Sequence, residues 1–178
     1  LKDLIHIHEN VLESDVCDFL VSLFEQTSDK HERYENSGKP NFTQFNLTEH
    51  RELTPEVSQV HNHIIKKIFE HRDKYYEFVD KRVFPEEHAL EQFRIKKYNP
   101  GGDDRFDTHV DVVDHETARR FLSYMWYLND VETGGETIFK DLSIQPKKGT
   151  LIMFPPIWMY PHKGNPPISG SKYILSTY

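Results

Sequence analysis

Hydrophobic residues recur with two different spacings along this chain. Up to about residue 88 they return every three or four positions, which predicts helices, and from Leu90 onward they alternate with polar residues, which predicts strands. A helical first half followed by a strand-rich second half is the pattern of an α+β fold.

Two helices are predicted in the first half. Ser14 is the expected N-cap of a helix that runs to about Thr27, because a serine hydroxyl there accepts a hydrogen bond from the first turn. Thr54 is the expected cap of the second helix, and the proline and glutamate that follow it are both favourable in a first turn. Its apolar residues continue at helical spacing, so we expect it to extend to about Val83.

The segments outside these helices are expected to be extended or irregular. Residues 4–8 predict a short strand, and the polar residues 28–50, which include Gly38 and Pro40, predict a long loop with room for a strand at 41–47. Loops of that length often cover binding sites.

Seven short strands are predicted in the second half, separated by turns rich in glycine and proline. They cover residues 90–98, 106–113, 120–128, 136–140, 149–154, 157–162 and 171–178. Many short strands with regular turns are typical of a sandwich or barrel, and a jelly roll is the natural candidate. We expect one domain over 1–178, with helical support in about 1–88 and the jelly-roll core in about 89–178.

Composition limits the classes of partner. The chain has 178 residues, enough for one domain with a real core, and a net charge of −7 with histidine neutral. Phosphate contacts need lysine and arginine, so we expect no nucleic-acid partner, while a basic peptide stays compatible with the charge. No apolar run approaches about 18 residues, so no membrane span is expected.

The single cysteine, Cys17, excludes an intramolecular disulfide. It falls on the apolar stripe of the first predicted helix, where we expect it to pack as a small hydrophobe. A chain of this kind fits a reducing compartment, and we therefore expect a cytoplasmic protein.

A His-x-Asp pair with a distant histidine is the two-histidine, one-carboxylate set that holds Fe(II) and leaves adjacent positions open. The pair occurs twice, at His71 and Asp73 and at His109 and Asp111. Residues two apart point to nearly opposite sides of a helix but to the same face of a strand. The strand-borne pair His109 and Asp111 can therefore converge on a metal, whereas the helical pair is expected on a solvated face.

His162 is the best third ligand, because it ends a predicted apolar strand just before a turn rich in glycine and proline. The alternative is a loop histidine without a metal. The remaining histidines lack a carboxylate partner, lie two apart on a helix, or fall in polar loops: His6, His8, His61, His63, His31, His50, His88 and His115.

Lys172 strengthens the case for His162. It follows that histidine by ten residues and lies on the last predicted strand, on the same face as Ile174 and Ser176. A lysine buried on such a strand is costly without a partner, and a dicarboxylate co-substrate supplies one through a charge-assisted hydrogen bond. The alternative is an edge-strand lysine whose amine reaches solvent.

The second half of the chain contains several motifs whose order and spacing agree with those of a known enzyme family. They are YNPGG at 98–102, FDTHVD at 106–111, MWYLNDVETGGETIF at 125–139, PKKGTLIMF at 146–154, and His162 followed by Lys172. Over about residues 90–178 the chain resembles the prolyl 4-hydroxylase branch of the Fe(II)/2-oxoglutarate-dependent dioxygenases. The resemblance implies a double-stranded β-helix, which is a jelly roll backed by helices.

The resemblance also implies roles for individual residues. His109, Asp111 and His162 would hold the catalytic iron, and Lys172 would bind the far carboxylate of 2-oxoglutarate, joined by Tyr98. Tyr127 and Thr137 would face the same pocket, although plain core packing is the alternative for these two and for Tyr98. The implied cofactors are Fe(II), 2-oxoglutarate and O2, with ascorbate as a further one.

The implied activity is hydroxylation of prolyl residues in a peptide or protein, with release of succinate and CO2. Two positions depart from the family pattern, Phe106 in place of a frequent tyrosine and Tyr178 in place of a frequent tryptophan. The alternatives are the same chemistry on another side chain or on nucleic acid, and a jelly roll that binds peptides without catalysis. Candidate substrate contacts are Asn41, Phe42 and Arg94.

Overall fold

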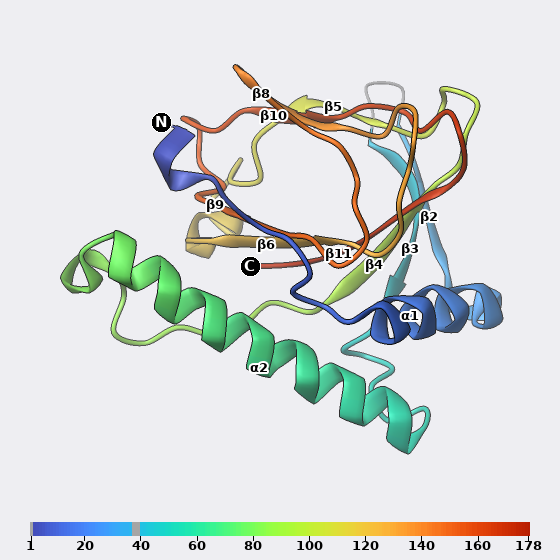
Figure 1. Ribbon diagram of the computed structural model, residues 1–178, viewed down its shortest axis with the longest axis horizontal. Coiled ribbons are helices and arrows are strands. Elements are labelled where there is room, and N and C mark those ends of the chain that lie inside the picture. The colour runs from blue at the N-terminus through green and yellow to red at the C-terminus, as the bar shows by residue number, and fades with distance from the viewer. Residues whose placement is uncertain (1, 37–39) are drawn as a thin grey trace.

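Two antiparallel sheets face each other, and two long helices lie under the larger sheet (Figure 1). The computed structural model describes residues 2–36 and 40–178. This arrangement of helices outside and paired sheets inside confirms the predicted α+β jelly roll. Residues 37–39 of the predicted loop lie outside the described residues.

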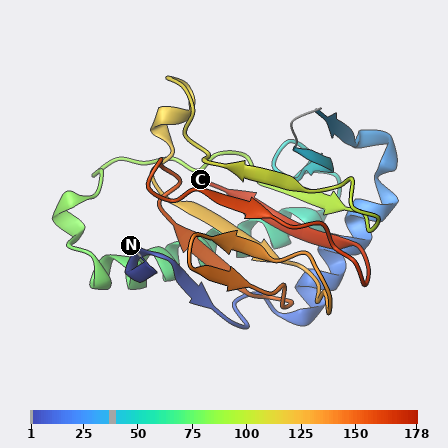
Figure 2. The same cartoon turned by 90° about the horizontal axis from the view of Figure 1, so that it is seen from above.

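The larger sheet has seven strands, and the smaller sheet has four. In spatial order the larger sheet contains β1 (His6–His8), β9 (Leu151–Phe154), β6 (Ser123–Tyr127), β11 (Lys172–Thr177), β4 (Arg94–Tyr98), β3 (Asn41–Asn46) and β2 (Glu32–Glu35). The smaller sheet contains β5 (Phe106–His109), β10 (His162–Gly164), β7 (Thr137–Phe139) and β8 (Leu142–Ile144). Seen from above, the strands of the larger sheet lie side by side over the helices (Figure 2).

The α-helices are α1 (Ser14–Gln26) and α2 (Pro55–Phe78). The chain also forms short 3-10 helices, η1 (Lys2–Leu4), η2 (Ser28–Lys30), η3 (Lys81–Val83) and η4 (Thr117–Arg119). Neither long helix, nor any other helix in residues 2–36 and 40–178, is apolar over a length that could cross a membrane.

The helix ends follow their capping chemistry with two corrections. Thr54 caps α2 as predicted, since its hydroxyl accepts a hydrogen bond from the backbone of Val57. The predicted extension to Val83 is wrong, because the backbone turns extended at Val79. Ser14 is the first helical residue of α1 and not its N-cap, which is Glu13.

Two hydrophobic clusters hold these layers together. One fills the space between the helices and the larger sheet and includes Cys17, Ile68 and Trp126, all fully buried. The other lies between the two sheets and includes Tyr127 and Ile174. Because alternate residues of a strand face opposite sides, β11 contributes to both clusters, and this places Lys172 in the space between the sheets.

The strand predictions were largely confirmed, with exceptions in both sheets. Residues 157–162 do not form a strand, since Tyr160 closes a turn onto Ile157 and β10 begins only at His162. The short strands β2 and β8 were not predicted. Within the predicted loop, β3 confirms the strand placed at 41–47, and the first half also contributes β1 to the larger sheet.

Candidate metal and co-substrate site

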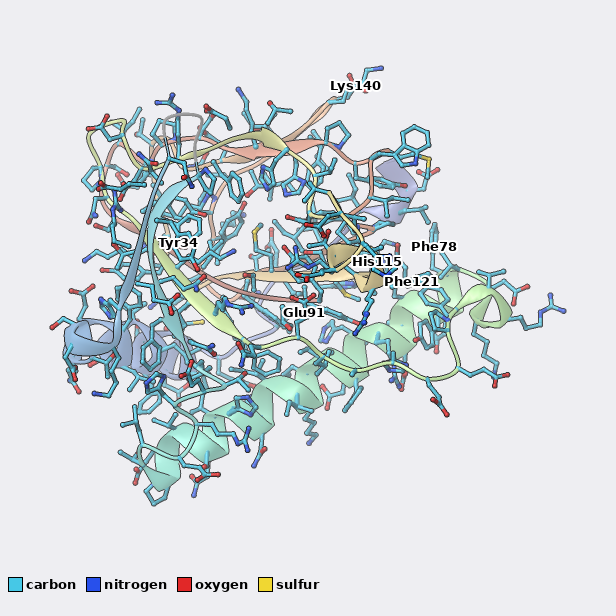
Figure 3. The ribbon with its side chains drawn as sticks, turned by 180° about the vertical axis from the view of Figure 1, so that it is seen from behind. Tyr34, Phe78, Glu91, His115, Phe121 and Lys140 are labelled. Atoms are coloured by element: carbon cyan, nitrogen blue, oxygen red, sulfur yellow. The ribbon has the colours of Figure 1, made fainter. Side chains whose placement is uncertain are left out.

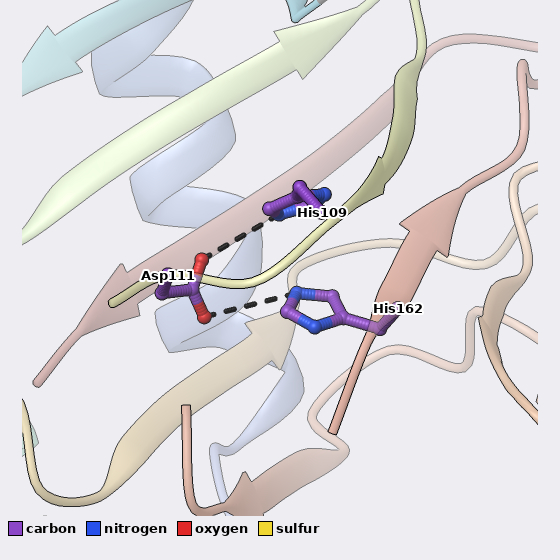
Figure 4. Close-up of side chains that lie close together, drawn as sticks. All are labelled: His109, Asp111 and His162. Atoms are coloured by element: carbon purple, nitrogen blue, oxygen red, sulfur yellow. Dashed lines mark ion pairs between the residues drawn. The ribbon is translucent and has the colours of Figure 1, made fainter. Parts of the chain in front are cut away.

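Three of the predicted site residues converge at one end of the space between the sheets (Figure 4). His109 ends β5 and is the register partner of His162, which begins β10. The Nε2 atom of His109 lies 3.5 Å from one carboxylate oxygen of Asp111, and the Nε2 atom of His162 lies 3.8 Å from the other. One potential ligand atom from each residue lies within 4.8 Å of the others, which fits a single metal ion.

The position of Asp111 has a cause other than strand alternation. The predicted strand 106–113 ends at His109, so Asp111 lies in the loop that follows. The backbone N–H groups of Asp111 and Val112 both donate to the carbonyl of Pro156, at 3.1 and 3.2 Å. This carbonyl, which is distant in sequence, holds the loop against the segment that follows β9. It thereby keeps the carboxylate beside the two imidazoles.

Each imidazole is oriented by a backbone carbonyl. The Nδ1 atom of His109 lies 2.8 Å from the carbonyl of Asp107, and that of His162 lies 3.1 Å from the carbonyl of Tyr160. A proton on Nδ1 satisfies each contact and leaves the Nε2 lone pair for a metal. The ring of Phe106 stacks on His109 with centroids 3.4 Å apart. Two Nε2 atoms and a carboxylate are a donor set that fits Fe(II).

The local electrostatics keep His162 and Asp111 in their ligating forms. Burial lowers the pKa of His162 to about 4 against the opposing pull of Asp111. Burial would raise the pKa of Asp111, but its hydrogen bond with His109 and the nearby His162 outweigh it and lower the pKa. At neutral pH the imidazole is therefore neutral and the carboxylate ionised, as metal binding requires.

Lys172 is buried, with 2 % of its surface exposed. Its ammonium donates to the carbonyl of Gly135 at 2.7 Å and lies 5.2 and 5.7 Å from the ring centres of Tyr98 and Tyr127. Burial lowers the pKa of Lys172 to about 7, with Glu136 acting in the opposite direction. A buried ammonium with a single neutral acceptor has capacity for an anionic partner.

A small cavity of about 50 Å³ connects the lysine with the three potential ligands. Its wall includes His109, Asp111, His162, Lys172, Tyr98 and Thr137. Tyr127 stands behind this wall, with its hydroxyl 2.6 Å from the hydroxyl of Thr137 and 3.1 Å from the carbonyl of Ile144. The structure thus places six of the seven predicted site residues on one cavity and the seventh in contact with it.

Arg120 is a residue beside this site that the sequence analysis did not single out. Its guanidinium donates to the backbone carbonyl of Asp111 at 2.8 Å and pairs with Glu91 at 2.9 Å. It also lies 4.2 Å from the ring centre of Tyr178. Nothing in the spacing of Arg120 marks it, because it is simply the first residue of the predicted strand 120–128 and belongs to none of the quoted motifs.

A larger groove of about 470 Å³ adjoins the cavity, between α2 and the segment around η4. Glu91 and Phe121, both labelled in Figure 3, line it together with Arg72 and Phe84. Tyr178 lines both the groove and the cavity. No pattern in the sequence predicted this groove.

The competing pair at residues 71 and 73 does not converge. Both lie on α2, as predicted, and Asp73 is exposed and pairs with Arg72. The expectation of a solvated face is wrong for His71, which is buried with its ring 5.0 Å from that of His8.

The proposed substrate contacts have mixed surroundings. The side-chain oxygen of Asn41 accepts a hydrogen bond from the backbone of Asn36. Phe42 is buried between the sheets and stacks on Tyr34. Arg94 donates to Gln92 on the outer surface and is not part of the cavity wall.

Comparison with known proteins by sequence points to the same class of protein as the site geometry. Residues 93–178 match the family described as the 2OG-Fe(II) oxygenase superfamily. Probable prolyl 4-hydroxylase 3 of Arabidopsis thaliana is 24 % identical over 94 % of this chain. The chain spans 66 % of the length of that relative and 20 to 40 % of other curated prolyl 4-hydroxylases that it matches.

Solved structures agree with the fold. The viral collagen prolyl hydroxylase of Paramecium Bursaria Chlorella virus-1, in complex with 2OG, superposes with a TM-score of 0.72 at 25 % identity, over 98 % of this chain and 94 % of that one. The prolyl hydroxylase of Trichoplax adhaerens, in complex with a hypoxia inducible factor peptide fragment, gives 0.76 at 13 % identity, over 98 % and 82 %. At that identity the second comparison shows the fold alone.

Sequence and fold together support a prolyl hydroxylase-like 2OG oxygenase, with the family match covering just under half of the chain. The curated relatives that it matches are named prolyl 4-hydroxylases, and the double-stranded β-helix implied by the sequence motifs is confirmed.

Proposed function

We propose that this protein is an Fe(II)- and 2-oxoglutarate-dependent dioxygenase that hydroxylates prolyl residues in a peptide or protein. The observation that carries the proposal is one cavity that joins His109, Asp111 and His162 to the buried ammonium of Lys172. A metal site alone would fit many proteins, whereas a metal site beside a buried cation fits a chelating dicarboxylate. We treat residues 1–178 as one domain that contains this whole site.

The two Nε2 atoms and the Asp111 carboxylate are the groups that would hold Fe(II). When bound with 2-oxoglutarate and O2, Fe(II) supplies an oxidative decarboxylation that yields succinate and CO2 and inserts one oxygen atom into a C–H bond. The ammonium of Lys172 would bind the far carboxylate of the co-substrate, and this fixes the orientation of the chelating end. The protein's contribution is therefore orientation and exclusion of water.

Tyr98 is suited to assist Lys172. Its side chain is buried beside the lysine, and burial raises the pKa of its hydroxyl well above the ordinary value, so the group remains a proton donor. Within residues 2–36 and 40–178 no acceptor lies within hydrogen-bond reach of this hydroxyl, which leaves it free for the same carboxylate. Thr137 lines the opposite wall, held by its contact with Tyr127.

The apolar wall of the cavity would exclude water from the reaction. Phe154 and Ile174 line it from the larger sheet, and both are nearly fully buried. Removing water strengthens the electrostatic interactions inside the site and suppresses side reactions.

The prolyl substrate is supported by relatives. The curated relatives carry the name prolyl 4-hydroxylase, and one structural neighbour was solved with a peptide fragment. We propose a proline-containing peptide or protein as substrate, ascorbate as a further cofactor, and a cytoplasmic location that fits the single unpaired Cys17.

Succinate formation tests the reaction class. The purified protein with Fe(II), 2-oxoglutarate and proline peptides should release succinate only when both iron and co-substrate are present, and Asp111→Ala should abolish the release. Mass spectrometry of the peptides tests the substrate. Turnover of 2-oxoglutarate with no peptide gaining one oxygen would refute the prolyl assignment and leave the oxygenase assignment standing.

A further inference from the structure

A second lysine lines the candidate cavity, and the reaction described above does not use it. Lys96 lies on β4, two residues before Tyr98 and therefore on the same face of the strand. Its ammonium stands 5.2 Å from the ring centre of Phe42. Among residues 2–36 and 40–178 it has neither a hydrogen bond nor an ion-pair partner within 4.0 Å.

The neighbouring lysines are different in this respect. Lys172 donates to the carbonyl of Gly135, and Lys97 pairs with Glu25 at 2.7 Å on the opposite face of β4. A half-buried charge without a partner is costly, and such groups are usually retained where a ligand completes them. Burial lowers the pKa of Lys96 to about 8 while Asp111 opposes the change, so the group is mainly a cation at neutral pH.

Lys96 and Lys172 serve different ends of the cavity. Asp111, and more weakly Glu91, which itself pairs with Arg120, are the negative charges that raise the pKa of Lys96, whereas Glu136 is the one that raises the pKa of Lys172. The Lys96 ammonium lies beside the ring of Phe42. The centre of that ring is 6.2 Å from the ring centre of Phe106, and the Phe106 ring stacks on His109. Lys96 therefore stands at the metal end, where a substrate would approach, and not at the end assigned to the far carboxylate of the co-substrate.

With Fe(II) and 2-oxoglutarate bound, the charges that line the cavity would leave Lys96 without a counter-charge. This step rests on the proposed function. Among the groups that line the cavity, the two positive charges of Fe(II) and the one of Lys172 would be matched by the Asp111 carboxylate and the two carboxylates of 2-oxoglutarate. The ammonium of Lys96 remains, in a site from which water is largely excluded, and so favours one further anion.

We propose that Lys96 binds a carboxylate of the substrate, so that preferred substrates carry an acidic group next to the reacting residue. The carboxylate can belong to an acidic side chain or to the free C-terminus of a peptide. The overall charge of −7 does not oppose this, because exposed charges beyond about 8–10 Å are screened at physiological salt, whereas this contact is short and partly buried.

Equilibrium binding of matched peptides tests the proposal without turnover. Mn(II) replaces Fe(II), 2-oxoglutarate is present, and oxygen is excluded. Three fluorescent proline peptides are compared by anisotropy: one with glutamate beside the proline and an amidated end, the same peptide with glutamine, and a neutral peptide with a free C-terminal carboxylate. The proteins are wild type, Lys96→Met and the matched control Lys97→Met.

The wild type should bind one carboxylate-bearing peptide about tenfold more tightly than the glutamine peptide, as a charge-assisted hydrogen bond would give. Which one shows the gain identifies the source of the carboxylate. Lys96→Met should abolish the preference and leave the affinity for the glutamine peptide unchanged, while Lys97→Met should keep the preference. Methionine retains the volume of the lysine stem, and thermal melting verifies that both variants fold.

Two results would overturn the proposal. Equal affinity of the wild type for all three peptides would show that no carboxylate is recognised. A loss of 2-oxoglutarate affinity in Lys96→Met, with the peptide preference intact, would assign the lysine to the co-substrate. Failure of the proposed function is distinguishable, because then neither Mn(II) nor 2-oxoglutarate would bind the wild type in the same titration.

Discussion

At the scale of single residues, the position of Lys172 depends on a glycine. Gly135 has φ +75°, a conformation that residues with a side chain rarely adopt, and its carbonyl accepts the hydrogen bond from the lysine. A Cβ atom at this position would lie 3.3 Å from Cδ of Lys172. The glycine therefore provides both the backbone direction and the space that the lysine needs.

The lowered pKa of Lys172 predicts a pH dependence of co-substrate binding. Above pH 7 the free protein loses the ammonium proton, and with it the charge-assisted hydrogen bond to a carboxylate. The dissociation constant of 2-oxoglutarate, measured by calorimetry with Mn(II) and without oxygen, should rise by up to about tenfold per pH unit above 7. Lys172→Met should bind weakly at every pH, and a flat profile in the wild type would contradict the assignment.

The two His-x-Asp pairs offer a matched comparison of metal binding. Asp111→Asn should weaken Mn(II) binding by more than about 100-fold, since even residues that merely support metal ligands are worth about 10–100-fold. Asp73→Asn makes the same chemical change on the exposed face of α2 and should leave the affinity unchanged. Isothermal titration measures both, and equal affinities would remove Asp111 from the ligand set.

At the scale of elements, α2 shows which features neighbouring residues in the sequence can predict. The Thr54 cap and the following proline are contiguous in sequence, and they predicted the first residue of the helix correctly. The loop that carries Asp111 is held by the carbonyl of Pro156, far along the chain, and no local pattern specifies that contact. The strand β2 has four exposed residues and exists through its pairing with β3, so alternation cannot reveal it.

The candidate site divides in the same way. Residue types and spacing predicted the three potential metal ligands and Lys172, because their chemistry is distinctive. Lys96 and Arg120 were missed, since their surroundings come from other parts of the chain: the ring of Phe42 on β3 lies beside Lys96, and the carbonyl of Asp111 accepts from Arg120.

The N-cap of α2 makes a stability prediction. Thr54→Ala removes the hydrogen bond to the backbone of Val57 and should lower the free energy of unfolding by about 1 kcal/mol. Thr54→Ser keeps a hydroxyl acceptor at the same position and should stay close to the wild type. Urea unfolding followed by circular dichroism measures both, and equal losses in the two variants would show that the hydroxyl contributes nothing.

At the scale of the whole molecule, a pair of histidines connects β1 with α2. The rings of His8 and His71 are 5.0 Å apart, and His8 keeps a buried Nε2 atom with no partner in the described part of the chain. Burial is the main cause that lowers the pKa of His8 to about 4, and it also lowers the pKa of His71. The nearby His71 lowers the pKa of His8 further, and Lys74 lowers the pKa of both rings. Charging these rings weakens the attachment of the first strand.

The sign of this effect is fixed by the direction of the shift. Because the folded-state pKa of His8 lies below its unfolded value of about 6.5, the unfolded chain binds the proton more readily between these two values. The melting temperature should therefore fall as pH decreases from 6.5 to 4. His8→Gln should reduce the slope, whereas His115→Gln, at an exposed position labelled in Figure 3, should leave it unchanged. Identical slopes in all three proteins would refute the role of His8.

The place of β11 has a consequence for how this chain acquires its structure. The strand comes after all others in sequence, yet it lies between β6 and β4 in the larger sheet. β6 can pair with β9 and β4 with β3 before residues 172–177 are made, but the edges of β6 and β4 that face β11 stay unpaired until then. Folding is expected as one late, cooperative event with few local contacts to start from, so the growing chain depends on protection from aggregation while it is being made.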